Sequence, residues 1–204
     1  MPMRPLYIIP IPPTPPIPGR LPEAFVSRQG LFSDEEMDRI QQAALHRESR
    51  RVVVGLDNKV DPDGNLSFVR HLPPNKEMQW AYQRILDVIS ELNARHFQFD
   101  ITGIDEPLYH VTYEGNEKGH YNWHIDANAP DRPRRKLAIT FQMSHPNEYE
   151  GGDLEINMTG IPVTAPKERG TLVMFPANHI HRVTPVTKGT RCALVTWIVG
   201  PPFK

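Results

Sequence analysis

The sequence lacks the features that mark several common protein classes. The single cysteine, Cys192, excludes an intramolecular disulfide and a cysteine-rich zinc module, and it is compatible with a reducing compartment. No apolar run approaches the roughly 18 residues that a membrane span needs, and early prolines interrupt the start where a secretory signal would lie. A formal net charge of -1 argues against a protein built mainly to bind nucleic acid. We therefore expect a cytoplasmic protein with neither a membrane nor a nucleic acid as partner.

Proline, in contrast, is abundant, with 22 residues in the chain. Many of them fall in "MPMRPLYIIPIPPTPPIPGR", residues 1–20. Because proline fixes φ and donates no backbone hydrogen bond, this segment is predicted to be extended, in a polyproline II conformation. It is either a docking segment for a proline-binding partner or an arm packed on the domain. Its isoleucines favour the packed arm.

Two helices are predicted in the first half of the remaining chain, 21–204, which we interpret as one domain. The first covers about 33–48, where Ser33 and Glu36 form a capping box. The second covers about 76–94, where apolar residues recur at helical spacing and indicate core packing. Between them, a long polar segment at 55–72 precedes a return strand, and a loop of this length in a compact domain often covers a binding site.

From about residue 97 to 200 the chain consists of short β-branched and aromatic runs, most of them separated by Gly, Pro, Asn or Asp. Many short strands at even spacing are typical of an antiparallel barrel or jelly roll. The predicted fold class is therefore mainly β (α+β), with an eight-stranded double sheet and the N-terminal helices packed against it.

The stretch "GHYNWHIDAN" concentrates histidine and carboxylate side chains. His120 and His124 have the spacing of a zinc-protease helix, but Tyr121 stands where that motif requires glutamate, and the flanking residues favour a strand. In a strand, His124 and Asp126 point to the same face, where an imidazole and a carboxylate can bind one metal ion. A third ligand must then come from another part of the chain.

The tail "NHIHRVTPVTKGTRCALVTW" offers that ligand. If its two strands turn near 187–189, His181 lies opposite Arg191 on one sheet face, whereas His179 lies one step farther away. A buried arginine needs an anionic partner, and a bound ligand can supply one. Two histidines and one carboxylate form the facial triad of non-haem Fe(II) oxygenases, which leaves coordination positions open.

These motifs, "HID", "PNEYEGGDLEI" and "HRVTPVTKGTR…W", resemble the Fe(II)/2-oxoglutarate dioxygenases of the prolyl 4-hydroxylase-like group, especially its PKHD-type bacterial members. The resemblance extends from about Phe32 to Pro201. It implies a double-stranded β-helix (cupin-like jelly roll) with iron bound by His124, Asp126 and His181.

The same resemblance implies that Arg191 binds the C5 carboxylate of 2-oxoglutarate and that Tyr113 and Trp197 line the cosubstrate pocket. Gln142 departs from relatives, which often carry an aromatic or aliphatic residue there. The implied cofactors are Fe(II), 2-oxoglutarate and O2, with ascorbate supporting activity, and the implied products are succinate, CO2 and a substrate hydroxylated at an unactivated C–H bond.

The expected substrate is a peptidyl residue, proline first, with a free amino acid or other small molecule as the alternative. A non-enzymatic, cupin-like metal-binding module would leave Arg191 without a partner. A proline-rich interaction protein with a degenerate barrel would leave the complete triad unexplained.

Other candidates have structural interpretations. His110 is expected to be a buried structural residue, Cys192 a small apolar one, and Gly151–Gly152 a tight entry into a strand. The basic run at 132–136 is interpreted as a solvated turn, or as a patch that steers an acidic substrate towards the metal. Tyr121 is a candidate for the substrate side of the iron.

Overall fold

The structure, a computed structural model, describes residues 9–10, 23–52, 61, 63–127 and 134–202. Most of the proline-rich segment 1–20, residues 55–60 and 62 of the expected loop 55–72, and the first two residues of the basic run 132–136 lie outside these ranges. Within the proline-rich segment, strand β1 (Ile9–Pro10) pairs antiparallel with β6 (Gly103–Ile104).

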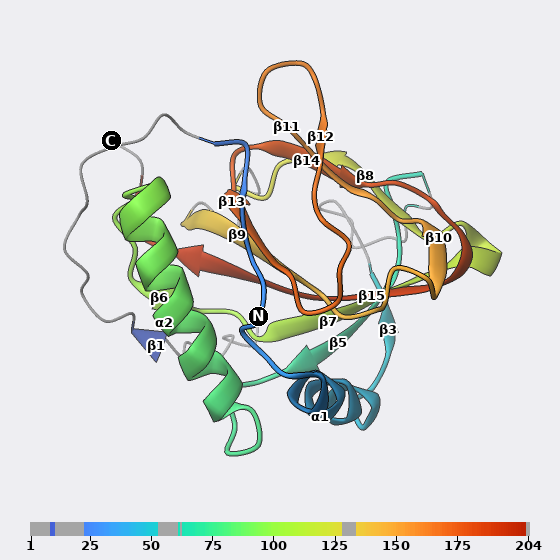
Figure 1. Ribbon diagram of the computed structural model, residues 1–204, viewed down its shortest axis with the longest axis horizontal. Helices are drawn as coiled ribbons and strands as arrows, with labels where there is room; N and C mark the ends of the chain where they lie inside the picture. The colour runs from blue at the N-terminus through green and yellow to red at the C-terminus, as the bar shows by residue number, and fades with distance from the viewer. Residues whose placement is uncertain (1–8, 11–22, 53–60, 62, 128–133, 203–204) are drawn as a thin grey trace, which may run out of the picture.

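Two antiparallel sheets form the body of the protein (Figure 1). The central path of the ten-stranded sheet runs, in order, through β2 (Val26–Arg28), β13 (Leu172–Pro176), β9 (Arg135–Gln142), β15 (Val186–Val199), β7 (Leu108–Glu114), β5 (Phe68–Leu72) and β3 (Arg50–Arg51). Strands β1, β6 and β10 (Tyr149–Gly151) attach beside this path. The five-stranded sheet contains β12 (Val163–Thr164), β11 (Leu154–Asn157), β14 (Ile180–Val183), β8 (His120–His124) and β4 (Asn65–Leu66).

Helices α1 (Asp34–Leu45) and α2 (Gln79–His96) lie against the large sheet, on the side away from the small one (Figure 1). Ser33 and Glu36 form the predicted capping box, since each side chain bonds to the backbone N–H of the other. On α2, the Tyr82 hydroxyl donates to Leu72 O and accepts from Leu108 N, both at 2.7 Å, and so ties the helix to β5 and β7. Neither helix is long and apolar enough to cross a membrane.

The large sheet is buried on both faces, and the side chains along each strand alternate between the two. Along β15, Leu194 and Ile198 pack with the helices, while Val186 packs with residues of the small sheet such as Leu154. Cys192 lies on the helix side as a partly buried neighbour of that core, as predicted. The prediction of a mainly β jelly roll with N-terminal helices packed against it is confirmed.

One predicted pairing is wrong. Strands β14 and β15 do not form a hairpin; they belong to different sheets, and Thr184 and Pro185 carry the chain from one sheet to the other. Arg191 therefore pairs with Tyr113 on β7, and His181 pairs with His124 on β8. Both His181 and Arg191 nevertheless line the same space, since the two sheets face each other.

Candidate metal centre

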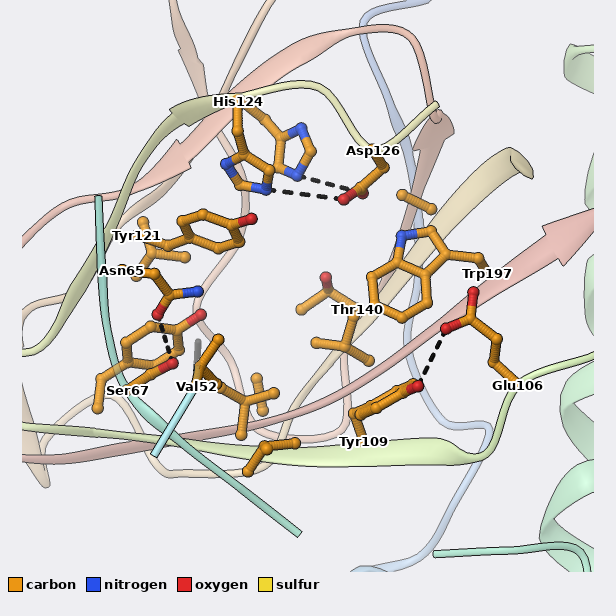
Figure 2. A pocket seen from close by; sticks show the side chains of 18 of the residues that line it. Val52, Asn65, Ser67, Glu106, Tyr109, Tyr121, His124, Asp126, Thr140 and Trp197 are labelled. Carbon is orange, nitrogen blue, oxygen red and sulfur yellow. Dashed lines mark hydrogen bonds and ion pairs between the residues drawn. The ribbon is translucent and has the colours of Figure 1, made fainter. Parts of the chain in front are cut away.

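Three side chains with metal-ligating atoms meet between the sheets. His124 and His181 are direct cross-strand partners on β8 and β14, and Asp126 follows just after the end of β8. One ligand atom from each of the three residues lies within 4.8 Å of the others. The Asp126 carboxylate is 3.7 Å from Nε2 of His124 and 3.4 Å from Nε2 of His181 (Figure 2). The strand position of His120 rules out the zinc-protease helix.

Backbone carbonyls orient the two imidazoles. Nδ1 of His124 lies 2.8 Å from Asn122 O, and Nδ1 of His181 lies 3.0 Å from His179 O. When Nδ1 carries the proton and donates it to a carbonyl, Nε2 keeps its lone pair for a metal ion. Both Nε2 atoms face the carboxylate of Asp126, so the three residues converge on one point.

Protonation also favours a metal site. Burial, together with the neighbouring His181, lowers the pKa of His124 to about 4, so His124 is neutral at physiological pH. Burial acts to raise the pKa of Asp126, but His181, His124 and Arg135 outweigh it, so the pKa of this carboxyl lies below its ordinary value. A neutral imidazole beside an ionised carboxylate is the state that binds a divalent cation.

A cavity of about 780 Å³ extends from this cluster between the two sheets. From the large sheet, β15 contributes Arg191, Ala193, Val195 and Trp197 to its wall. The part of the 55–72 segment that the structure describes also reaches it: Asn65 bonds to Ser67 at 2.6 Å on its edge (Figure 2). The cavity therefore connects the cluster with both sheets and with this segment.

Arg191 is a fully buried cation in this wall, with 1% of its surface exposed. Its Nη2 donates to Oε1 of Gln142 at 2.9 Å, and its guanidinium carbon lies 5.3 Å from the centre of the Tyr113 ring. Its Nε–H has no hydrogen-bond partner, and no carboxylate of the described residues lies within ion-pair distance of it. A buried guanidinium without a counter-ion is unfavourable, so the site suits an anionic ligand.

The glycine pair of "EGGD" makes room for this arginine. Gly152 has φ +63, and a Cβ there would lie 2.9 Å from Cδ of Arg191 and from Cγ2 of Val186. Gly151 has φ +74, and a Cβ there would lie 2.1 Å from Pro185 O. The two glycines therefore do more than start a strand: Gly152 lets the backbone approach the stem of Arg191, and Gly151 lets it approach Pro185.

A second buried arginine, Arg135, lies beside the cluster of His124, Asp126 and His181. Its Nε and Nη2 donate to the two oxygens of Glu106 at 2.7 and 2.8 Å, and its Nη1 is 3.8 Å from Asp126 Oδ1. Its guanidinium carbon lies 3.3 Å from the centre of the Trp197 ring. Trp197 thus lines the cavity beside Arg135.

The interpretation of 132–136 as a solvated turn is wrong for Arg135 and Lys136, which are both buried. A β-bulge explains the error. Ile198 pairs with Leu137, whereas the next residue, Val199, pairs with Arg135, so Lys136 is an extra residue in β9. The bulge reverses the alternation of side chains and turns Arg135 into the cavity. No sequence signal that we recognised marks this position.

The other histidine and tyrosine candidates lie as follows. Tyr121 stacks on His124, with ring centres 3.5 Å apart, and lines the cavity, and its place on the substrate side of the iron stays a prediction. His110 faces the helices, is 1% exposed and bonds to Gln41 at 2.7 Å, as a structural residue does. His179 turns away from the cluster, and its Nδ1 lies 3.1 Å from Ala24 O.

The fold and the cluster agree with comparisons to known proteins. A model of the 2OG-Fe(II) oxygenase superfamily matches residues 109–199, which include the three clustered residues and Arg191. Among solved structures, a Trichoplax adhaerens prolyl hydroxylase in complex with a hypoxia inducible factor peptide fragment has a TM-score of 0.72, at 17% identity over 86% of this chain and 83% of that one. A Pseudomonas putida prolyl-4-hydroxylase has a TM-score of 0.66, at 14% identity over 87% and 93%. The class is therefore an oxygenase of the 2OG-Fe(II) superfamily, whose members use Fe(II), 2-oxoglutarate and O2.

Comparison with curated relatives identifies the family within this superfamily. A PKHD-type hydroxylase of Bordetella pertussis is 34% identical over 167 residues, which is 77% of this chain and 73% of the relative. One from Stutzerimonas stutzeri is 28% identical over 176 residues, 78% of this chain and 76% of the relative. With one from Alteromonas mediterranea the match is 38% identical but spans only 41% of this chain and 39% of the relative. The chain belongs to the PKHD-type hydroxylases. As a member of this family it is an enzyme, which argues against a non-enzymatic metal-binding module and against a proline-rich interaction protein.

Proposed function

We propose that this protein binds Fe(II) through His124, Asp126 and His181 and hydroxylates an unactivated C–H bond. The observation that carries the proposal is the convergence, in one cavity, of these three ligands and of a buried arginine with no carboxylate partner among the described residues. Three protein ligands leave coordination positions for a chelating cosubstrate and O2. With these bound, the iron supplies the oxidising chemistry that releases succinate and CO2.

Arg191 is proposed to hold the far carboxylate of 2-oxoglutarate. A guanidinium matches a carboxylate through two parallel hydrogen bonds, and no carboxylate of the described residues pairs with Arg191 in competition with the ligand. Tyr113, directly opposite Arg191 on β7, closes the same end of the cavity. Burial raises the pKa of the Tyr113 phenol, so it is a neutral hydrogen-bond donor at physiological pH. Trp197, beside Asp126, is proposed to line the cosubstrate pocket at its metal end.

The proposed substrate is a peptidyl residue, with proline first. One comparison supports a peptide: the structurally similar Trichoplax enzyme was solved in complex with a peptide fragment. In this chain the cavity wall around Tyr109, Trp197 and Val69 is largely apolar and aromatic, which suits a compact apolar side chain. A free amino acid or other small molecule is the second candidate.

The activity is tested by succinate release. Purified protein with Fe(II), ascorbate and 2-oxoglutarate should release succinate slowly, and a peptide substrate should accelerate the release. Proline-containing peptides, their alanine-substituted counterparts and free proline separate the two substrate classes. Omission of ascorbate should lower the number of turnovers before inactivation. If anaerobic titration shows binding of neither Fe(II) nor 2-oxoglutarate, the proposal is wrong.

Substitution of two neighbouring histidines, His179 and His181, tests which of them is the third metal ligand. His181→Ala should abolish tight metal binding and succinate formation, because it removes one of three converging ligands. His179→Ala is the matched control: its imidazole faces Ala24 O, so this variant should keep both. Metal affinity of each purified variant is measured by titration. The reverse result would transfer the ligand assignment to His179.

A further inference from the structure

Gln142 is the residue that the proposed function leaves unexplained. It is 1% exposed, it lies at the end of β9, and its side-chain oxygen accepts the hydrogen bond from Nη2 of Arg191. A buried glutamine must satisfy both ends of its amide, so its position beside the proposed cosubstrate anchor constrains that anchor.

The orientation of the Gln142 amide follows from its second partner. Its Nε2 donates to Pro166 O at 2.9 Å, and a carbonyl can only accept, so the amide nitrogen must face Pro166 and the oxygen must face Arg191. The backbone of Gln142 is held as well, since its N–H donates to Thr171 O at 2.9 Å and its carbonyl accepts from Gly170 N at 2.8 Å. The oxygen presented to Arg191 is therefore fixed in place.

The charge of that oxygen matters as much as its position. A carboxylate at this point would form an ion pair with Arg191 and would compete with any incoming anion. The neutral amide oxygen holds one nitrogen of the guanidinium but leaves its positive charge uncompensated. Gly152 and Tyr113 enclose the rest of the side chain. Arg191 is thus held in one orientation, with its charge kept for a ligand.

We propose that Gln142 is a positioning residue that sets the cosubstrate specificity of this enzyme. By fixing the guanidinium of Arg191 at one depth, it selects a 2-oxo acid whose second carboxylate reaches that depth when the 2-oxo end lies at the metal cluster. The inference rests on the proposed function, because it assumes that Arg191 holds the far carboxylate of 2-oxoglutarate.

Binding measured without turnover tests this inference. The wild type, Gln142→Glu and Gln142→Met are loaded with Mn(II) without O2 and titrated calorimetrically with 2-oxoglutarate, the shorter oxaloacetate and the longer 2-oxoadipate. Gln79→Glu, on the exposed side of α2, is the matched control for the added charge.

Gln142→Glu should weaken 2-oxoglutarate binding about a hundredfold, because its carboxylate neutralises Arg191. Gln142→Met should weaken it about tenfold, the scale of one lost charge-assisted hydrogen bond, and should reduce the preference for 2-oxoglutarate over the other two diacids. Gln79→Glu should bind as the wild type does, and Mn(II) affinity should be the same in all four proteins.

Wild-type affinity and wild-type preference in Gln142→Met would overturn the inference, even if Gln142→Glu did not fold. A wild type that binds Mn(II) but none of the three diacids would overturn the proposed function, and this inference with it. The two failures are therefore distinguishable.

Discussion

The two buried arginines of the cavity, Arg135 and Arg191, differ in how their charge is balanced. Arg135 donates two hydrogen bonds to the carboxylate of Glu106 and lies on the Trp197 ring. Arg191 donates to a neutral amide and has no carboxylate of the described residues within ion-pair distance. Trp197, which lies against Arg135, and Arg191 are six residues apart along β15, and both line the cavity. One end of the cavity is electrostatically complete, and the other requires an anion.

The largest expected effect is at the complete end. Glu106→Gln keeps the shape of the side chain but removes the charge that balances Arg135. Breaking one partner of a buried ion pair typically costs ~3–5 kcal/mol, and we expect that loss in the free energy of unfolding. Chemical denaturation of the metal-free protein measures it. Glu150→Gln is the control, because Glu150 pairs with Lys188 on the surface and should lose only ~0–1 kcal/mol. Equal stability of both variants would remove the distinction between the two arginines.

His110 shows a third way to bury a basic side chain, which is to lose its proton. Burial, together with the charge of Arg70, lowers the pKa of His110 from 6.5 to about 4. The unfolded chain therefore binds more protons than the folded one between pH 6.5 and 4. The contribution of His110 to the free energy of unfolding is thus fully present above pH 6.5 and is lost as the pH drops towards 4.

A pKa shift of this magnitude changes the free energy of unfolding by about 3 kcal/mol across this pH range. His110→Asn should remove that contribution, so the stability of the variant should fall less steeply across this range than that of the wild type. Denaturation of the metal-free proteins at several pH values measures the two slopes, and His145→Asn, at an exposed loop position, is the control. Parallel curves for the wild type and His110→Asn would show that His110 does not contribute.

The smallest expected effect concerns ligand binding at the incomplete end. Arg191→Met should weaken 2-oxoglutarate binding by ~1.5–3 kcal/mol, the usual scale for hydrogen bonds to a charged group. Its metal affinity and its free energy of unfolding should stay close to those of the wild type, because no carboxylate among the described residues loses a partner. Arg135→Met should show the opposite pattern, with lower stability. If Arg191→Met is destabilised as strongly as Arg135→Met, the two ends do not differ as described.

Much of the site followed from local patterns. The H-x-D spacing placed an imidazole and a carboxylate together on the assumption of a strand, and His124 does end β8 with Asp126 beside it. Alternation in β15 also placed Cys192 and Arg191 on opposite faces, as they are. Such predictions succeed because they depend only on the period of a strand.

Predictions that needed a three-dimensional connection or an irregularity failed. "VTPV" looks like part of a hairpin, and nothing local shows that Thr184–Pro185 passes between sheets. Arg135 was missed because a bulge at Lys136 interrupts the strand period. Gln142 could not be understood from sequence, since Pro166, which orients its amide, comes from a distant segment.

The short passage between β14 and β15 determines where this chain can accept insertions. Thr184 N donates to Asp153 O and Gly152 N to Pro185 O, so the link is held on both sides by the segment that contains the glycine pair. An extra residue here would shift His181 relative to Arg191. Gly160, between β11 and β12, has no atom within 4 Å of the position of a Cβ. Since doubling the length of a flexible loop costs only ~0.6 kcal/mol, a tag or a whole reporter domain inserted at Gly160 should leave both the proposed metal ligands and Arg191 in place.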